Sequence, residues 1–326
     1  LNTNYPPNEN ALYWTVSAQK AGPAVIRISY LIGNMAAQPS YQGIVENDEK
    51  SLLMQVYMTV TNTSGEDFGA ATVQPGVGKT TVRYFNNGER KRMLAAKFAQ
   101  VPIAKRYVFD AQIDQKRTRM YYRLVNDKDN QMGQFPLPHG KMRLFIKEPA
   151  SDDDVARSQA FLGEDWAKYT PLFAPLDLYV GVAQDVKVER FTMQPEEGPK
   201  KNFDELTCPR YTMDGKESVT QPKFRHLRTR FRYRLQNFKT ENGEPVPVPL
   251  VIKEHVDGEW IIEKVELKEL TGERNEQTEE TIPYEEFFTE KRIDVNNVEF
   301  EMKLPPTDVD TKYDLFVTIL RKNRRY

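Results

Sequence analysis

The chain has 326 residues, of which 39% are hydrophobic and 29% are charged, and its formal net charge at pH 7 is -1. This length accommodates two domains of ordinary size, each with its own hydrophobic core. Because positive and negative charges nearly cancel, no overall field draws the chain to nucleic acid or to an anionic membrane, and no apolar run approaches the roughly 20 residues of a transmembrane helix.

The redox compartment and the origin of the first residue stay open. Cys208 is the single cysteine, so no disulfide forms within the chain, and we interpret it as an inert thiol in a loop. The sequence begins at Leu1 rather than at methionine, which fits either a cleaved leader or a fragment of a longer protein.

The clearest predicted element is a strand that begins at Ser51 and ends in a turn at residues 62–65. Its side chains alternate between apolar and polar, which is typical of a half-buried strand. Thr59 is expected on the polar face. The face expected to point inward consists of Leu52, Met54, Val56, Met58 and Val60.

Upstream of this strand, we expect an N-terminal arm over residues 1–25 with a short strand at 11–17, a stronger strand at 24–31, and a loop at 33–42 that contains Pro39. Downstream, strands are predicted at residues 102–110, 117–125, 141–147, 177–181, 185–191, 223–238, 246–252, 259–267, 298–304 and 312–320.

Four further expectations complete this outline. Residues 177–181 and 185–191 are predicted to pair as a hairpin, and prolines place strand 246–252 at a sheet edge. The best helical candidate is Asp152–Phe161, because three aspartates suit a helix N-terminus. Residues 270–290 form an acidic excursion from the sheet.

The pattern predicts an all-β protein with two parts. A larger, irregular β-sandwich domain occupies residues 26–193. Residues 194–222 lose all periodicity and are rich in Pro, Gly and charge, which is typical of a linker. Residues 223–326 are expected to form a C-terminal immunoglobulin-like β-sandwich, because five or six strands follow one another in about 100 residues.

Several motifs resemble the bacterial domain-of-unknown-function family 4139, which includes mucoidy-inhibitor-like proteins. They run from the opening strand to the final sandwich: Ile28-Ser29-Tyr30, Pro39-Ser40-Tyr41, Val60 to Phe68 (VTNTSGEDF), Leu137 to Arg143 (LPHGKMR), Phe161 to Glu164, Thr170-Pro171, Leu178 to Gly181, Asp185 to Val188, Tyr233 to Asn237 and Val246-Pro247-Val248. The family's tryptophans are replaced by Gln38 and Phe68 here, and its N-terminal coiled coil is absent, so the resemblance is to a divergent member. It implies an extracytoplasmic, non-enzymatic protein in the periplasm or at the cell surface.

Three candidate ligand sites fail their motif requirements, and we therefore expect no cofactor and no bound metal. Gly76–Thr81 looks like a phosphate loop, but Val73 stands where the first glycine is needed. His139, His226 and His255 share no zinc-ligand spacing. Asp152–Asp154 with Glu164 and Asp165 lack the pattern of a calcium loop.

The strongest charge pattern is a row of four arginines that share one strand face: Arg228, Arg230, Arg232 and Arg234. Three interpretations stay open. The arginines pair with glutamates of the same chain, such as Glu259, Glu263, Glu266 and Glu269. Alternatively, they bind an anionic polymer such as a glycan, or they contact a protein partner.

No acid–base pair, nucleophile triad or metal cluster can be assembled from the sequence. We therefore expect a non-enzymatic structural or protein-interaction component of the bacterial cell envelope or cell surface, with other subunits or its own copies as partners. The alternative is a binding module for an anionic glycan that uses the arginine face.

Overall fold

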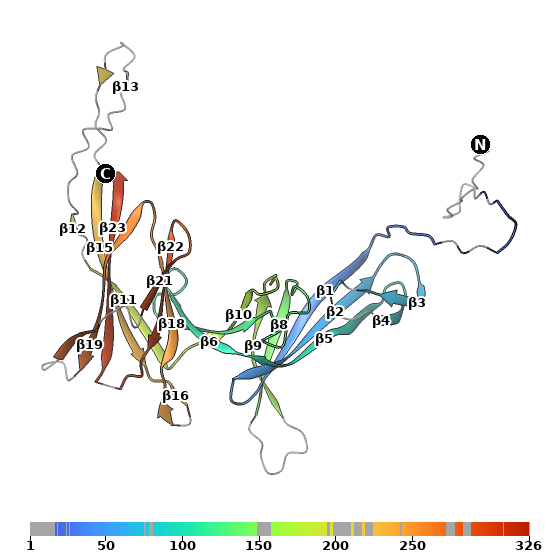
Figure 1. Cartoon of the computed structure of the whole chain (residues 1–326), viewed down its shortest axis with the longest axis horizontal. Coiled ribbons are helices and arrows are strands. Elements are labelled where there is room, and N and C mark those ends of the chain that lie inside the picture. The colour runs from blue at the N-terminus through green and yellow to red at the C-terminus, as the bar shows by residue number, and fades with distance from the viewer. Residues whose placement is uncertain are drawn as a thin grey trace.

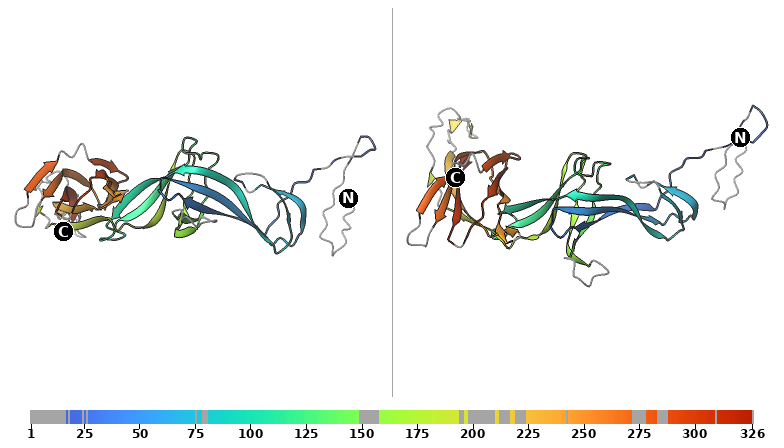
Figure 2. Two further views of the ribbon diagram at one scale, coloured as in Figure 1. Left: turned by 90° about the horizontal axis from the view of Figure 1, so that it is seen from below. Right: turned by 60° about the horizontal axis from the view of Figure 1, so that its bottom comes forward.

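The computed structural model describes residues 17, 19–23, 25, 27–74, 76–77, 81–148, 158–193, 196–197, 210–211, 217–218, 224–241, 243–271, 278–282, 288–308 and 310–325. All regular elements in these ranges are β-strands, so the predicted all-β class is confirmed, whereas the immunoglobulin-like layout stays a prediction. The strands gather in two bodies that lie end to end along the long axis (Figures 1 and 2).

The first body is built on a five-stranded sheet in the order β5-β2-β1-β8-β9. Its strands are β1 (Met35–Val45), β2 (Ser51–Asn62), β5 (Arg90–Pro102), β8 (Gly140–Lys147) and β9 (Gln159–Ala167), and a separate hairpin pairs β3 (Phe68–Val73) with β4 (Thr81–Phe85). The predicted inward face of β2 is confirmed, because all five of its apolar residues are buried. Thr59 departs from the prediction, since only 9% of it is exposed.

A six-stranded sheet joins the two bodies. Its order is β10 (Pro175–Val182), β7 (Arg119–Val125), β6 (Ala104–Asp110), β18 (Val248–His255), β22 (Asn297–Leu304) and β21 (Phe288–Arg292). Strands β6 and β18 pair in parallel, from Leu250 opposite Tyr107 to Lys253 opposite Asp110. Tyr122 of β7 packs in the first hydrophobic core, and Tyr107 of β6 packs in the second. The shared sheet therefore connects two cores without a break in its hydrogen-bonding ladder (Figure 1).

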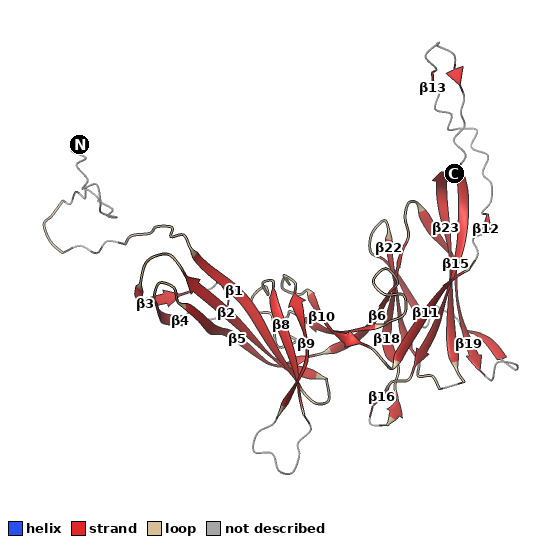
Figure 3. Cartoon of the chain, turned by 180° about the vertical axis from the view of Figure 1, so that it is seen from behind, coloured by secondary structure: helices blue, strands red, loops and turns tan. Residues whose placement is uncertain are grey.

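The second core lies between this shared sheet and a third one. The third sheet runs β11 (Val186–Thr192), β15 (Phe224–Asn237), β23 (Lys312–Arg325), β19 (Trp260–Thr271) and β20 (Thr278–Ile282), and β12 (Glu196–Glu197) also pairs with β15 (Figure 3). Two short hairpins complete the described strands: β13 (Arg210–Tyr211) with β14 (Glu217–Ser218), and β16 (Thr240–Glu241) with β17 (Glu244–Pro245).

Three predictions about prolines and pairing are wrong. The loop expected at residues 33–42 lies largely within β1, whose bounds are Met35–Val45. The strand carrying Pro249 is not at an edge, because β18 lies between β6 and β22. The strands near 177–181 and 185–191 exist but do not form a hairpin: β10 pairs with β7, whereas β11 pairs with β15. Strands adjacent in sequence therefore diverge into two sheets.

Two further local predictions differ from the structure. Residues 27–31 form no strand, although the sequence favours one at 24–31. Residues 159–161, expected at the end of a helix, begin strand β9, where they pair with β8. The rest of that expected helix (152–157), most of the strand at 11–17 and parts of the acidic segment 270–290 lie outside the described residues.

Candidate functional site

The predicted arginine face lies on β15 and belongs to the outer surface of the third sheet. The alternating residues Phe231, Tyr233 and Leu235 are buried in the second core. The four arginine side chains are 29–40% exposed, so they lie along the sheet rather than extending freely into water.

Each of these arginines pairs with a carboxylate of the same chain. Arg228 reaches Glu263 at 2.5 Å and Arg230 reaches Glu266 at 3.0 Å. Arg232 and Arg234 share Asp314, a residue only 2% exposed. The Arg228 guanidinium holds the pKa of Glu263 below its ordinary value.

The acids that do the pairing are partly those expected. Glu263 and Glu266 are predicted partners, and Asp314 is not. Glu259 instead lies 3.6 Å from Lys322, and Glu269 accepts a hydrogen bond from the Tyr313 hydroxyl. Arg230 also stacks over Phe316, with 4.4 Å from the guanidinium carbon to the ring centre.

The other residues singled out in the sequence are dispersed. His139 stacks on Trp166, with ring centres 5.1 Å apart. His255 lies between Asn297 and Asp257, and its hydrogen bonds with them raise its pKa. The described residues contain no group of three His, Cys, Asp or Glu that could hold a metal ion. The side chain of His226, Asp152–Asp154, Cys208 and residues 78–80 of the glycine loop lie outside the described part.

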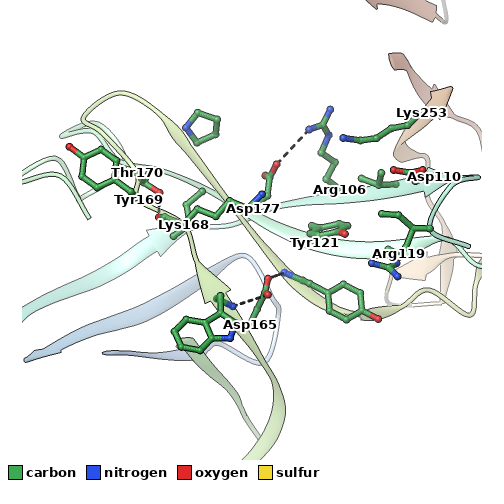
Figure 4. A pocket seen from close by; sticks show the side chains of 16 residues that line it. Arg106, Asp110, Arg119, Tyr121, Asp165, Lys168, Tyr169, Thr170, Asp177 and Lys253 are labelled. Carbon is green, nitrogen blue, oxygen red and sulfur yellow. Dashed lines mark hydrogen bonds and ion pairs between the residues drawn. The ribbon is translucent and has the colours of Figure 1, made fainter. Parts of the chain in front are cut away.

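A cleft that the sequence did not predict lies where the two bodies meet, and its volume is about 520 Å³. Most of the side chains that line it are charged or aromatic (Figure 4). The lining residues are Arg106, Val108 and Asp110 of β6, Ile113 after β6, Arg119 and Tyr121 of β7, Asp165 and Trp166 of β9, Lys168, Tyr169 and Thr170 after β9, Pro175, Leu176, Asp177 and Tyr179 of β10, and Lys253 of β18.

Ion pairs and hydrogen bonds fix the walls of this cleft. Arg106 contacts Asp177 of β10, and it also reaches Glu299 and Glu301 of β22, so it links the two bodies. Asp177 in addition binds Arg123 through two hydrogen bonds of 2.6 and 2.7 Å. The cleft is therefore largely formed before any ligand arrives.

Asp165 connects the two sheets that border the cleft. Its carboxylate accepts a hydrogen bond of 2.7 Å from the backbone N–H of Tyr179, so β9 is held against β10. A second hydrogen bond comes from the backbone N–H of Trp166. Figure 4 shows Asp165 between β9 and β10. This arrangement places Trp166 and Tyr179 on the same cleft.

The sequence contained one usable signal for this site. Tyr121 lies among Arg119 and Arg123 on the polar face of the predicted strand 117–125. An aromatic side chain on an otherwise charged strand face is a candidate contact residue. Trp166 and Lys168 carried no such signal. A helix was expected just before them and no strand was predicted at the position of β9, so no neighbouring strand was expected to bring them to a cleft.

Comparisons with known proteins give no identification. No family model, no curated protein and no solved structure matches the chain. Among the described residues, no helix is long and apolar enough to cross a membrane.

Proposed function

We propose that the chain is a non-enzymatic structural or protein-interaction component of the bacterial cell envelope or cell surface. The envelope location rests on the resemblance of the motifs given above to the bacterial domain-of-unknown-function family 4139. The interaction role rests on one feature of the fold, the segment of residues 27–34 that precedes β1.

The sequence favours a strand in this segment, but the structure shows it without a partner strand among the described residues. Ile28, Tyr30 and Leu31 are 50%, 66% and 103% exposed, and no β-pairing in the described chain involves residues 27–34. Adjacent exposed apolar residues on a protein surface mark interaction sites. An extended segment of this kind gains backbone hydrogen bonds and apolar burial when it joins the edge of another sheet. We assign it to pairing with a neighbouring protein subunit.

The oligomeric state of the protein in its native extract tests this proposal. Wild-type protein is expected in a complex with another subunit or with its own copies, measured by size-exclusion chromatography with light scattering. Ile28→Asp with Leu31→Asp should release a folded monomer, because Ile28 and Leu31 belong to neither hydrophobic core. Tyr84→Asp is the control, since Tyr84 is 64% exposed and lies outside the segment. A monomeric wild type, or a complex that survives the double substitution, contradicts the proposal.

The glycan alternative through the arginine face has less support. Each of the four guanidinium groups already has a carboxylate partner in the chain. An anionic polymer would have to displace those carboxylates, one of which is buried.

A further inference from the structure

The cleft at the junction of the two bodies differs from the arginine face because two of its cations have no carboxylate partner among the described residues. Neither Arg119 nor Lys168 forms an ion pair within the part of the chain that the structure describes. Arg106 and Lys253, by contrast, both reach Glu299. The cleft therefore offers two cations whose charge is available to an anionic ligand.

Aromatic rings form the neighbouring surface. Tyr121 and Tyr179 come from adjacent strands, and their ring centres are 5.6 Å apart. The Arg119 guanidinium carbon lies 5.5 Å from the centre of the Tyr179 ring. This contact keeps the cation beside the aromatic surface, because the face of an aromatic ring attracts positive charge.

Trp166 is a third aromatic residue of the cleft lining, and Lys168 follows it by two residues. The indole is 49% exposed although it is large and apolar. One of its faces is covered by His139, whose ring plane lies at 3° to it. The stacked imidazole fixes the orientation of the indole, which lines the cleft. The C–H groups of a pyranose ring suit an aromatic residue of this kind, since the face of an aromatic ring carries partial negative charge.

A carboxylate decides between the classes of anionic ligand. Asp110 also lines the cleft, and it forms no ion pair within the described part of the chain (Figure 4). Its oxygens accept hydrogen bonds but cannot donate them. A nucleic-acid backbone has only acceptor oxygens along its phosphates and is repelled by this carboxylate. Sugar hydroxyls can donate to it, while an acidic group on the same sugar chain meets Arg119 and Lys168.

We propose that this cleft binds an acidic oligosaccharide, with the sugar faces on Tyr121, Tyr179 and Trp166 and the acidic groups at Arg119 and Lys168. The proposal is independent of the subunit contact assigned to residues 27–34, because that segment does not line the cleft.

Titration of the full chain with saccharides tests the proposal. The probes are tetragalacturonate and a sulfated heparin tetrasaccharide, with neutral cellotetraose, a thymidine tetranucleotide and a tetraglutamate peptide as comparisons. Isothermal calorimetry gives the affinity, and tryptophan fluorescence reports contact with Trp166. At least one acidic saccharide is expected to bind saturably, and added salt should weaken the binding because it screens exposed charges.

Matched variants locate the binding. Arg119→Gln with Lys168→Gln should weaken the acidic saccharide about tenfold or more, and Trp166→Ala should weaken it without changing the net charge. Lys116→Gln with Arg117→Gln removes the same charge next to the cleft and should leave the affinity within about twofold. Circular dichroism checks that each variant is folded.

Three results would overturn the assignment. The first is that neither acidic saccharide binds the wild type. The second is that binding persists unchanged in folded cleft variants. The third is that the tetranucleotide or the tetraglutamate peptide binds as tightly as the saccharides, since the cleft would then select charge alone.

Discussion

Pro39 and Pro249 occupy the same position relative to the ladder in two different strands. Pro39 of β1 lies opposite Met58 of β2, and parallel pairing of β1 with β8 begins at the next residue, Ser40. Pro249 of β18 lies opposite Lys303 of β22, and parallel pairing with β6 begins at Leu250. Each proline therefore stands immediately before the residue at which its strand gains a second neighbour. Proline has no N–H to donate, so a strand that is otherwise central tolerates it where one side still has no partner strand.

Moving the proline by one residue in β1 should break the sheet. From Ser40 onward, β1 has a strand on each side, so a missing N–H costs a ladder hydrogen bond. Ser40→Pro is expected to lower the free energy of unfolding by about 3 kcal/mol or more. Pro39→Ala should cost less than about 1 kcal/mol. Urea unfolding followed by fluorescence measures both variants, and equal losses would show that the position of the proline is unimportant.

The register of β2 gives a second prediction. Val56 is fully buried, whereas the neighbouring Gln55 is half-buried and lies on the other face. Val56→Asp should prevent folding, because an unpaired carboxylate in an apolar core costs several kcal/mol. Gln55→Glu, which also adds one negative charge, should remain folded with a melting temperature close to that of the wild type. Thr59→Asp should also destabilise the protein, since Thr59 is itself nearly covered. A folded Val56→Asp protein would contradict the register.

Local patterns predicted the strands better than they predicted the partners of those strands. The alternation from Leu52 to Val60 is complete within one strand, so it could be read without knowledge of the rest. Strand β1 was not predicted because Pro39 is a residue that usually interrupts strands. The rule that places prolines at sheet edges does not cover a strand that is an edge over only part of its length. The separation of β10 from β11 depends on distant strands, β7 and β15, and no local signal carries that choice.

The same limit applies to the candidate sites. The arginines of β15 were found because they alternate within one strand, and two of their partners, Glu263 and Glu266, were expected from their charge alone. Asp314 was not expected, because its approach depends on the register between β15 and β23. The cleft brings together residues from Arg106 to Lys253 through the contact of two sheets, and sequence spacing does not encode that contact.

Acid should weaken the link between the two bodies through Glu299. Burial alone would raise the pKa of this carboxyl, but its bonds with Lys253 and Arg106 outweigh burial and hold the pKa below its ordinary value. The unfolded chain therefore takes up the proton at a higher pH than the folded chain. The contribution of Glu299 to stability is complete above the ordinary glutamate pKa and is lost as the pH falls through the lowered value.

Glu299→Gln is the variant that isolates this effect. At neutral pH it should lower the free energy of unfolding by about 1–3 kcal/mol, because hydrogen bonds to a charged partner are lost. The difference from wild type should shrink toward zero in acid, where protonated Glu299 resembles glutamine. Unfolding in urea across a pH series measures it. A difference that stays constant with pH would show that the ion pairs contribute nothing.

A buried amide holds the end of β15. The side-chain nitrogen of Asn237 donates to the carbonyl oxygens of Val246, Leu304 and Pro305, at 2.8, 3.2 and 3.2 Å. Asn237→Asp replaces this donor with a carboxylate that faces three acceptors, so we expect a loss of about 3 kcal/mol or more. Asn87→Asp is the control, because the exposed Asn87 side chain accepts a hydrogen bond and keeps that role as aspartate. Similar losses in thermal and urea unfolding for both variants would contradict this assignment.

Asp314 should divide the arginine face into two energetic halves. Arg232 and Arg234 both pair with this carboxylate, which is 2% exposed, whereas Arg228 and Arg230 pair with glutamates that are 24% and 21% exposed. Arg232→Gln with Arg234→Gln leaves a buried charge without a partner and should cost about 3–5 kcal/mol. Arg228→Gln with Arg230→Gln removes the same charge and should cost about 1 kcal/mol or less per pair, because water already screens those glutamates.

Adding Asp314→Asn to the Arg232→Gln, Arg234→Gln double variant should restore part of its stability, since no buried charge is then left. Urea unfolding of the three proteins measures these differences. Equal losses in the two double variants, or no recovery with Asp314→Asn, would mean that the arginines stabilise the sheet through packing on Phe316 rather than through Asp314.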